Sequence, residues 1–255
     1  MSRAIASTLI LASALALAAP AAAAERICPA SCDWGYGPGG GPDRWGEVCC
    51  PLCDGRRQSP IDILPGKAKA AELPEIRVSY RESHLELSND GHTIGVADLL
   101  TPGANFIELG ESRYALTGLH FHSLSEHTIG GRHSPMELHL EHRRTSWDLA
   151  TIAVLIDEGP DNPAFAPLWS ALPASADDPA RTVILDPDTL LPESRGYYTY
   201  LGSLTVPNCA ETVTWYVLRE PVLLSAAQID AFRALYDHNY RPVQEPNGRV
   251  VRTRE

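Results

Sequence analysis

The sequence predicts an α+β fold that is mainly β: a single domain built on a large, mostly antiparallel β-sheet with short peripheral helices. Between about residues 76 and 157, short runs alternate apolar and polar side chains and are separated by Gly, Asn, Asp or Ser. Such alternation is typical of strands with one buried face. No internal repeat or linker divides the chain, and 255 residues with 44% hydrophobic content can form one substantial core.

Residues 1–24 have the pattern of a secretory signal peptide. Arg3 precedes the apolar run AIASTLILASALALAAP, and the AAAAE that follows fits cleavage between Ala24 and Glu25. A membrane anchor is the alternative, but the run spans only about 16 residues and no charged stop follows it. We therefore expect a secreted or periplasmic protein without a transmembrane segment in the mature chain.

Residues 25–66 predict an N-terminal segment that wraps over the body of the domain, 25–255, because they are rich in Gly, Pro and Cys and show no period. An even number of cysteines in an oxidising compartment indicates disulfides. Cys50 and Cys53 form a C-x-x-C motif, which in the cytosol could be a redox or zinc site. Export and the absence of a second such motif favour structural bridges. The six cysteines are Cys28, Cys32, Cys49, Cys50, Cys53 and Cys209.

Seven strands are expected from the alternating runs and their turn-forming boundaries. In chain order they are IRVSY from 76, HLELS from 84, FIELG from 106, LHFHS from 119, MELHLEH from 136, LATIAVLI from 149 and TVTWYVLRE from 212.

Two helices are expected at the periphery. NPAFAPLWSAL places Asn162 as an N-cap and Pro163 at the first helical position. SAAQIDAFRALYDH carries a capping box, Ser225 to Gln228, before an apolar stripe.

Six of the nine histidines lie between residues 119 and 142, four of them on two of the predicted strands. Residues two apart on a strand point to one face, so His120 and His122 project together. A neighbouring strand brings His139 alongside. Three imidazoles that converge from adjacent strands can hold zinc and leave a fourth position for water. The sequence therefore predicts a catalytic zinc site.

Ordinary, partly solvated strand histidines are the alternative interpretation. A lone H-x-H would favour it, but a third histidine follows at a hairpin-compatible distance, and Glu126 and Glu137 are close in sequence. A helical zinc-protease site is excluded because the chain has no H-E-x-x-H motif.

The net charge of the chain argues against polyanionic partners. Without residues 1–24 the chain has 20 basic and 32 acidic side chains, since only Arg3 is lost from the full count of 21 against 32. The resulting net charge of −12 argues against binding of nucleic acid or of anionic membrane surfaces.

The order of several motifs resembles the alpha-class carbonic anhydrases, over nearly the whole chain after residue 24. Each motif is weak alone, and together they are specific. They are WGYG at 34, GPDRW at 41, RQSPIDI at 57, NDGH at 89, HFHSLSEH at 120, ELHLEH at 137, YYTYLGSLTVPNCAE at 197 and NYRP at 239.

The resemblance implies roles for individual residues. His120, His122 and His139 match the three Zn²⁺ ligands, and Glu137 matches the carboxylate that orients the third ligand. Thr205 matches the threonine that orients zinc-bound hydroxide and passes its own proton to Glu126. His92 matches the proton shuttle, and Tyr36 matches a tyrosine that orders the water chain. Further matches to the substrate pocket are Leu204, Val213 and Trp215.

Five positions depart from the family pattern. Val206, in the pocket, replaces the usual second threonine beside the metal. Gly118 stands where a glutamine usually supports the first ligand, so His120 needs another partner, such as water or backbone. Glu141 and Thr151 replace apolar residues of the carbon dioxide pocket. We expect Glu141 to point inward with His139, where a buried carboxylate would slow the reaction. The alternative is a local bend that lets Glu141 reach solvent or pair with Arg143 or Arg144. Asn208 replaces a proline, and we expect its turn to be remodelled rather than to keep a cis peptide.

The resemblance further implies zinc-dependent, reversible hydration of carbon dioxide to bicarbonate and a proton, with inhibition by sulfonamides and anions. An exported zinc-binding protein of the same fold, with weak hydratase activity and used for binding or ester hydrolysis, is the alternative. The family also implies a disulfide between Cys53 and Cys209, which would close a loop of about 156 residues and stabilise the fold by roughly 4 to 5 kcal/mol.

Overall fold

A computed structural model describes residues 32–97 and 103–255, so the predicted signal peptide and Cys28 lie outside the described residues. In this part of the chain, no helix is long and apolar enough to cross a membrane.

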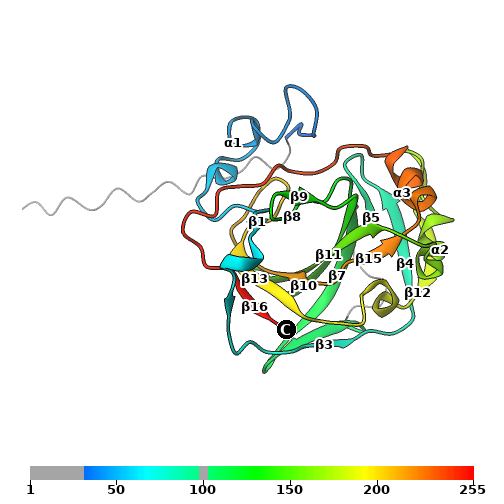
Figure 1. Ribbon diagram of the computed structural model, residues 1–255. Coiled ribbons are helices and arrows are strands. Elements are labelled where there is room, and N and C mark those ends of the chain that lie inside the picture. The colour runs from blue at the N-terminus through cyan, green and yellow to red at the C-terminus, as the bar shows by residue number, and fades with distance from the viewer. Residues whose placement is uncertain (1–31, 98–102) are drawn as a thin grey trace, which may run out of the picture.

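A mixed sheet of thirteen strands runs through the centre of the described chain (Figure 1). Most neighbours are antiparallel, as predicted, but β11 pairs in parallel with β14 and β15, and β16 with β2. The spatial order is β12-β4-β5-β7-β10-β11-β14-β13-β16-β2, with β3, β6 and β15 attached to it. The strands are β2 (Lys69–Ala70), β3 (Ile76–Ser79), β4 (Ser83–Asn89), β5 (Ile94–Ala97), β6 (Phe106–Leu109), β7 (Ser112–His122), β10 (Met136–Thr145), β11 (Asp148–Glu158), β12 (Arg181–Leu185), β13 (Tyr197–Gly202), β14 (Val213–Leu218), β15 (Val222–Leu224) and β16 (Arg252–Arg254).

A second, small sheet and short helices surround this centre. The small sheet joins β1 (Asp62–Ile63), β8 (Thr128–Ile129) and β9 (Arg132–His133). The 3₁₀ turns are η1 (Pro51–Asp54), η2 (Pro65–Lys67), η3 (Pro163–Phe165) and η4 (Pro187–Leu190), and the α-helices are α1 (Trp45–Val48), α2 (Ala166–Trp169) and α3 (Ala226–Arg233).

Both predicted helices are present, with the predicted caps. The Asn162 side chain accepts a hydrogen bond from the Ala164 amide, and η3 continues from there into α2. Ser225 and Gln228 form the reciprocal capping box that begins α3. Each cap satisfies amides that the first helical turn would leave without a partner.

The two faces of β7 serve different purposes. Phe121 is fully buried, and its ring packs against Phe165, Trp169 and Phe232 of the segments around α2 and α3. Burial of such a side chain stabilises the fold by about 1.5 to 3 kcal/mol. The histidines on either side of Phe121 therefore face away from the aromatic core, which holds their strand rigidly in place.

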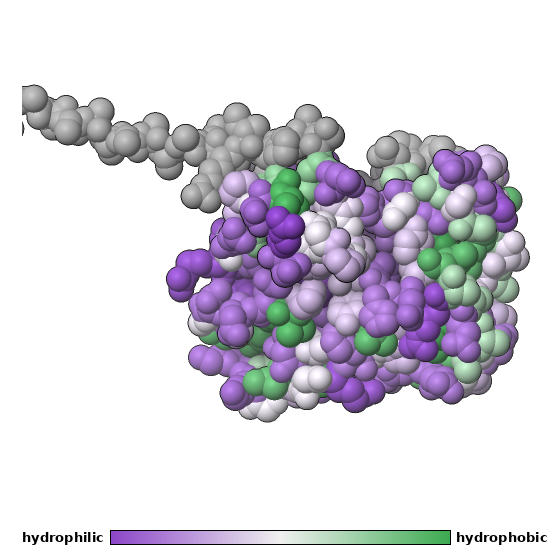
Figure 2. All heavy atoms as spheres, turned by 90° about the horizontal axis from the view of Figure 1, so that it is seen from above, coloured by the Kyte–Doolittle hydropathy of each residue, from purple (hydrophilic) through white to green (hydrophobic). Residues whose placement is uncertain are grey.

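The N-terminal segment packs as a separate aromatic and disulfide cluster. Cys53 and Cys209, the pair that the resemblance implied, are bonded, as are Cys32 and Cys49. Cys50 is also disulfide-bonded. The Trp45 ring, fully buried, donates from Nε1 to the Gly35 and Gly40 carbonyls. Seen from above, hydrophilic side chains cover most of the surface and apolar ones form small, separate groups (Figure 2).

Candidate metal centre and active-site cavity

Three histidines converge from two adjacent strands. His120 and His122 come from β7 and His139 comes from β10, and the antiparallel register places His139 directly opposite His120. One ligand atom of each residue lies within 4.8 Å of those of the other two. The period of two along each strand and the register between them thus produce the predicted cluster.

The ring nitrogens are oriented for a shared cation. His139 Nδ1 lies 3.2 Å from His120 Nε2. The other nitrogen of His139, Nε2, contacts Glu137 at 2.8 Å, and His122 Nδ1 contacts the Asn239 carbonyl at 2.6 Å. His122 Nε2 is buried and has no hydrogen-bond partner within the described chain. Buried polar atoms are nearly always partnered, so this orphan nitrogen fits a metal ligand.

The protonation of the histidines also suits a metal. Burial lowers the pKa of His120 and His122, and it lowers the pKa of His139 well below its usual range. The imidazoles are therefore neutral at pH 7, which is the form that binds metal ions.

A buried chain of hydrogen bonds supports His139 from behind. Glu137 Oε1 contacts both His139 Nε2 and His127 Nδ1, the latter at 2.7 Å, and Glu137 Oε2 accepts from the His127 amide. His127 Nε2 meets the Tyr200 hydroxyl at 2.7 Å, and Tyr200 donates to Ser59 Oγ. Burial opposes ionisation of Glu137, but His127 and His139 outweigh it and hold the pKa of Glu137 well below its usual range. Glu137 is therefore an anion that fixes the His139 ring.

Glu126 is a second buried carboxylate next to the cluster. Its Oε1 accepts from the Arg241 amide at 2.8 Å, and its side chain hydrogen-bonds with Thr205. Its Oε2 lies 3.5 Å from His122 Nε2. Burial, with Glu137 nearby, raises the pKa of Glu126 to about 7, and the Thr205 hydrogen bond opposes that rise. The structure thus brings Thr205 and Glu126 together beside the histidine cluster.

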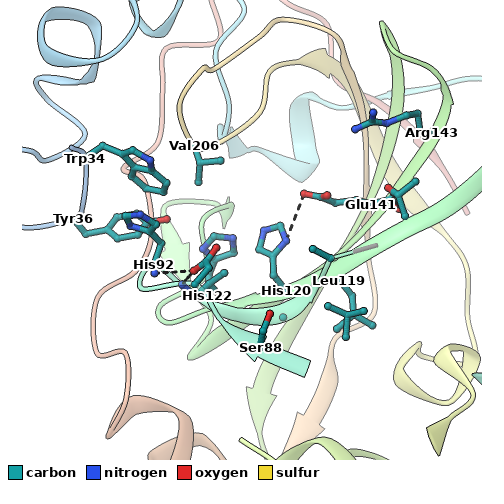
Figure 3. A pocket seen from close by; sticks show the side chains of 16 residues that line it. Trp34, Tyr36, Ser88, His92, Leu119, His120, His122, Glu141, Arg143 and Val206 are labelled. Atoms are coloured by element: carbon teal, nitrogen blue, oxygen red, sulfur yellow. Dashed lines mark hydrogen bonds and ion pairs between the residues drawn. The ribbon is translucent and has the colours of Figure 1, made fainter. Parts of the chain in front are cut away.

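A cavity of about 340 Å³ opens from this cluster to the surface. Figure 3 shows that Trp34 and Tyr36 stand on one side and Glu141 and Arg143 on the other, with the histidines between them. The lining of the cavity includes Trp34, Tyr36, His92, Leu119, His120, His122, Glu141, Arg143 and Val206.

His92 stands at the aromatic side of the cavity. Its ring stacks on Trp34, with centroids 3.7 Å apart and planes 9° apart. The Asp90 carboxylate accepts from the His92 amide at 2.8 Å, which fixes the turn that carries the ring. Burial raises the pKa of the nearby Tyr36, so its hydroxyl stays protonated and can donate to water.

A family model described as eukaryotic-type carbonic anhydrase matches residues 40–255. The chain belongs to the alpha carbonic anhydrase family. A carbonic anhydrase of Klebsiella pneumoniae is 38% identical over 86% of this chain and 89% of its own length. A carbonic anhydrase of Pectobacterium carotovorum is 37% identical over 87% of this chain and 91% of its own length.

Solved structures agree. The alpha-carbonic anhydrase from Thermovibrio ammonificans, in complex with the inhibitor sulfanilamide, has a TM-score of 0.82 and 37% identity, and the match covers 87% of this chain and 99% of that one. The Photobacterium profundum alpha-carbonic anhydrase has a TM-score of 0.78 and 35% identity over 86% and 99%. Both the family and the fold predicted from the sequence are confirmed.

The remaining pocket residues that the carbonic anhydrase pattern predicts lie in two places. Val206 lines the cavity, while Leu204, Val213 and Trp215 belong to an apolar cluster next to it. The Trp215 ring contacts His139, with centroids 4.8 Å apart. Thr151 is buried on β11, paired with Glu141 on one side and Trp215 on the other.

The expectation for Glu141 is right about its entry into the cavity and wrong about its burial, and the expectation for Asn208 is wrong. Glu141 lines the cavity, but its side chain is 43% exposed rather than buried, with Oε1 3.5 Å from His120 Nδ1. It is free to lie there because Gly118, its partner across the strands, has no side chain. The peptide from Pro207 to Asn208 is cis, so the turn keeps the form that we expected to be lost. The disulfide of Cys209 and the hydrogen bond from Gln58 to its carbonyl hold this segment.

Sequence reasoning missed three residues around the site. Asn239 joins His122 to the turn that carries His92, because its carbonyl contacts His122 and its side chain donates to the His92 carbonyl at 3.1 Å. His127 completes the support of Glu137, and Trp34 stacks on His92. All three lie inside the sequence motifs that carried the carbonic anhydrase resemblance. Membership in these motifs could have identified them as residues of the site.

Proposed function

We propose that this protein holds one Zn²⁺ on His120 Nε2, His122 Nε2 and His139 Nδ1 and catalyses the reversible hydration of carbon dioxide to bicarbonate. One observation carries the proposal: three neutral imidazole nitrogens, one of them buried without a partner, face each other beside a cavity. When bound, zinc lowers the pKa of water to about 7 and so supplies a nucleophile at neutral pH.

The chain's own residues supply orientation and proton transfer. Thr205 donates its hydroxyl proton to Glu126, so its oxygen is left as an acceptor that can orient the attacking group. Glu126 is fixed in turn by the Arg241 amide. His92 then takes up the proton that the reaction releases, because its imidazole lies in the cavity and can act as a general base there. Tyr36 is placed to order the intervening water.

The apolar cluster of Leu204, Val213 and Trp215, with Val206 in the cavity, is the proposed resting place of carbon dioxide. Sulfonamides and small anions are the expected inhibitors, in line with the sulfanilamide complex of the Thermovibrio ammonificans relative.

Export is proposed as well. Bonded cysteines persist in oxidising compartments and are rare in the cytosol, and the described part of the chain has them at Cys53 and Cys209 and at Cys32 and Cys49. Together with the signal-peptide pattern of residues 1–24, this supports a secreted or periplasmic protein.

A weak hydratase that serves mainly for binding or ester hydrolysis is the second candidate. The observation in its favour is Glu141, whose carboxylate lines a cavity that otherwise suits a nonpolar gas. The paired Thr205 and Glu126, together with His92, favour the hydratase, because a binding protein has no use for a proton relay.

The test combines zinc analysis with stopped-flow hydration of carbon dioxide. Zinc-replete protein should carry one zinc per chain and hydrate carbon dioxide, and His139→Ala should lose both properties because two imidazoles do not retain zinc tightly. His84→Ala is the matched control, since His84 is an exposed histidine on β4. Full zinc occupancy in His139→Ala, or a zinc-loaded parent without hydratase activity, would refute the proposal.

A further inference from the structure

Gly118 leaves a gap in the support of the metal-binding histidines. A Cβ at this position would stand 2.6 Å from the Val96 carbonyl oxygen, a distance that requires the backbone of β5 to move. Strand β5 pairs with β7 here, with Ala97 opposite Gly118. The close approach of β5 therefore requires glycine, and no side chain from position 118 can reach His120.

A side chain from the opposite strand occupies this gap. Glu141 on β10 is the partner of Gly118 in the register. Its Oε1 lies 3.5 Å from His120 Nδ1, and its Oε2 lies 3.7 Å from the place of a Cβ on Gly118. The carboxylate thus lies over the glycine and next to the ring nitrogen that points away from the other two histidines (Figure 3).

The position of the Glu141 backbone is set by an irregularity in the strand pairing. The register between β7 and β10 shifts between Glu141 and His142, so that Thr117 is an extra residue on β7. The Thr117 hydroxyl donates to the Glu141 carbonyl at 3.2 Å. Irregularities of this kind redirect side chains next to active sites.

We propose that Glu141 positions His120 for zinc by accepting a hydrogen bond from Nδ1. The proposal rests on the proposed function in one respect, namely that His120, His122 and His139 hold the metal. The other two ligands already have protein acceptors, Glu137 for His139 and the Asn239 carbonyl for His122. With Glu141, each of the three histidines has a hydrogen-bond acceptor within the protein.

A hydrogen-bond acceptor behind a ligand fixes the tautomer and the orientation of the imidazole, and its loss typically costs 10- to 100-fold in metal affinity. Glu141 is 43% exposed, so solvent screens its charge and the lower part of that range applies. Acceptance of the hydrogen bond, rather than the negative charge, is therefore the main contribution.

The experiment compares Glu141→Gln with Glu141→Val. Glutamine keeps a side-chain oxygen of the same reach, and valine removes it. Zinc affinity is measured by competition with a chelator, and the zinc-release rate into excess chelator is measured separately. We expect Glu141→Val to bind zinc on the order of tenfold more weakly and Glu141→Gln to stay within roughly threefold of the parent.

Two controls separate positioning from other effects. Arg143→Ala alters an exposed cavity residue on the same strand and should leave zinc affinity unchanged. Long-range nitrogen NMR of the histidines, run on the zinc-free protein, should place the proton of His120 on Nδ1 in the parent and in Glu141→Gln. In Glu141→Val it should show a mixture of tautomers.

The outcomes distinguish this proposal from the proposed function. Zinc affinity in Glu141→Val equal to that of the parent, or an equal loss in Glu141→Gln and Glu141→Val, would overturn the role of Glu141 and leave the hydratase intact. A parent that binds zinc without hydrating carbon dioxide would overturn the function alone, because the affinity series still reports on Glu141.

Discussion

The three histidines were predictable because a strand fixes which way its side chains point. The period of two placed His120 and His122 on one face, and the spacing to His139 required only a hairpin-like neighbour. Strand parity predicted that Glu141 enters the cavity, but the placement of its carboxylate beside His120 could not be predicted. It depends on the register irregularity at Thr117 and on the space above Gly118, and both are properties of the paired strands rather than of either sequence run.

At the scale of single residues, His92 yields a prediction about proton transfer. The ring lies in the cavity, stacked on Trp34, but it is not a metal ligand. His92→Ala should therefore lower kcat on the order of 100-fold, because proton export then relies on water and buffer. The value of kcat/KM for hydration should stay close to that of the parent, since attack on carbon dioxide does not use the shuttle.

Stopped-flow kinetics in dilute and concentrated imidazole buffer check this prediction, because a small imidazole in solution should restore kcat. His84→Ala, on the exposed side of β4, is the control. Unchanged kcat in dilute buffer would assign the shuttle elsewhere.

At the scale of elements, every strand of seven or more residues in the described chain was predicted, whereas β13 and several short strands were missed. The expected runs all correspond to strands, from β3 to β14. In β13, five of six residues are buried, so YYTYLG does not alternate and was not expected as a strand. The parallel pairing of β11 with β14 joins segments more than 60 residues apart, and no local pattern encodes it.

His142 yields a prediction about pH that belongs to this scale, because its ring links three strand segments. It is buried on β10, its Nδ1 donates to the Ala150 carbonyl on β11 at 3.1 Å, and its Nε2 accepts from the hydroxyl of Tyr80, just after β3. Burial lowers the pKa of His142 to about 3. In the unfolded chain the same side chain titrates near 6.5. Between these two pKa values His142 binds a proton in the unfolded chain but not in the folded one. The stabilisation that neutral His142 provides is therefore complete above pH 6.5 and decreases as the pH falls.

Between pH 6.5 and pH 5, His142 is expected to lower the free energy of unfolding by about 2 kcal/mol. His142→Gln should be less stable than the parent at pH 7, by about 1 to 3 kcal/mol, because two buried partners lose their hydrogen bonds. It should nevertheless lose less stability on acidification. Urea unfolding of both proteins at pH 7, 6 and 5 measures the difference, and parallel pH profiles would contradict a neutral, buried His142.

At the scale of the whole molecule, the disulfide between Cys53 and Cys209 joins the N-terminal segment to the loop of the site. Thr205 lies four residues before Cys209, and Gln58 donates to the Cys209 carbonyl and Ser203 to the Gln58 side chain. The bridge was implied by family resemblance alone, because spacing cannot assign pairs among six cysteines. Its position means that global stability and the placement of Thr205 depend on the same bond.

The two described disulfides allow a matched test of this dependence. Cys53 and Cys209 are 156 residues apart, and Cys32 and Cys49 are 17 apart. In the chain-entropy model the longer loop contributes about 5 kcal/mol and the shorter one about 3 kcal/mol. Cys53→Ala with Cys209→Ala should therefore lower the free energy of unfolding by about 2 kcal/mol more than Cys32→Ala with Cys49→Ala. The former should also lose hydratase activity below its unfolding temperature, since the Thr205 loop is released, while the latter keeps it. Urea unfolding without reductant and activity across a temperature series measure the two effects, and equal behaviour of the two double variants would show that the long bridge has no special role at the site.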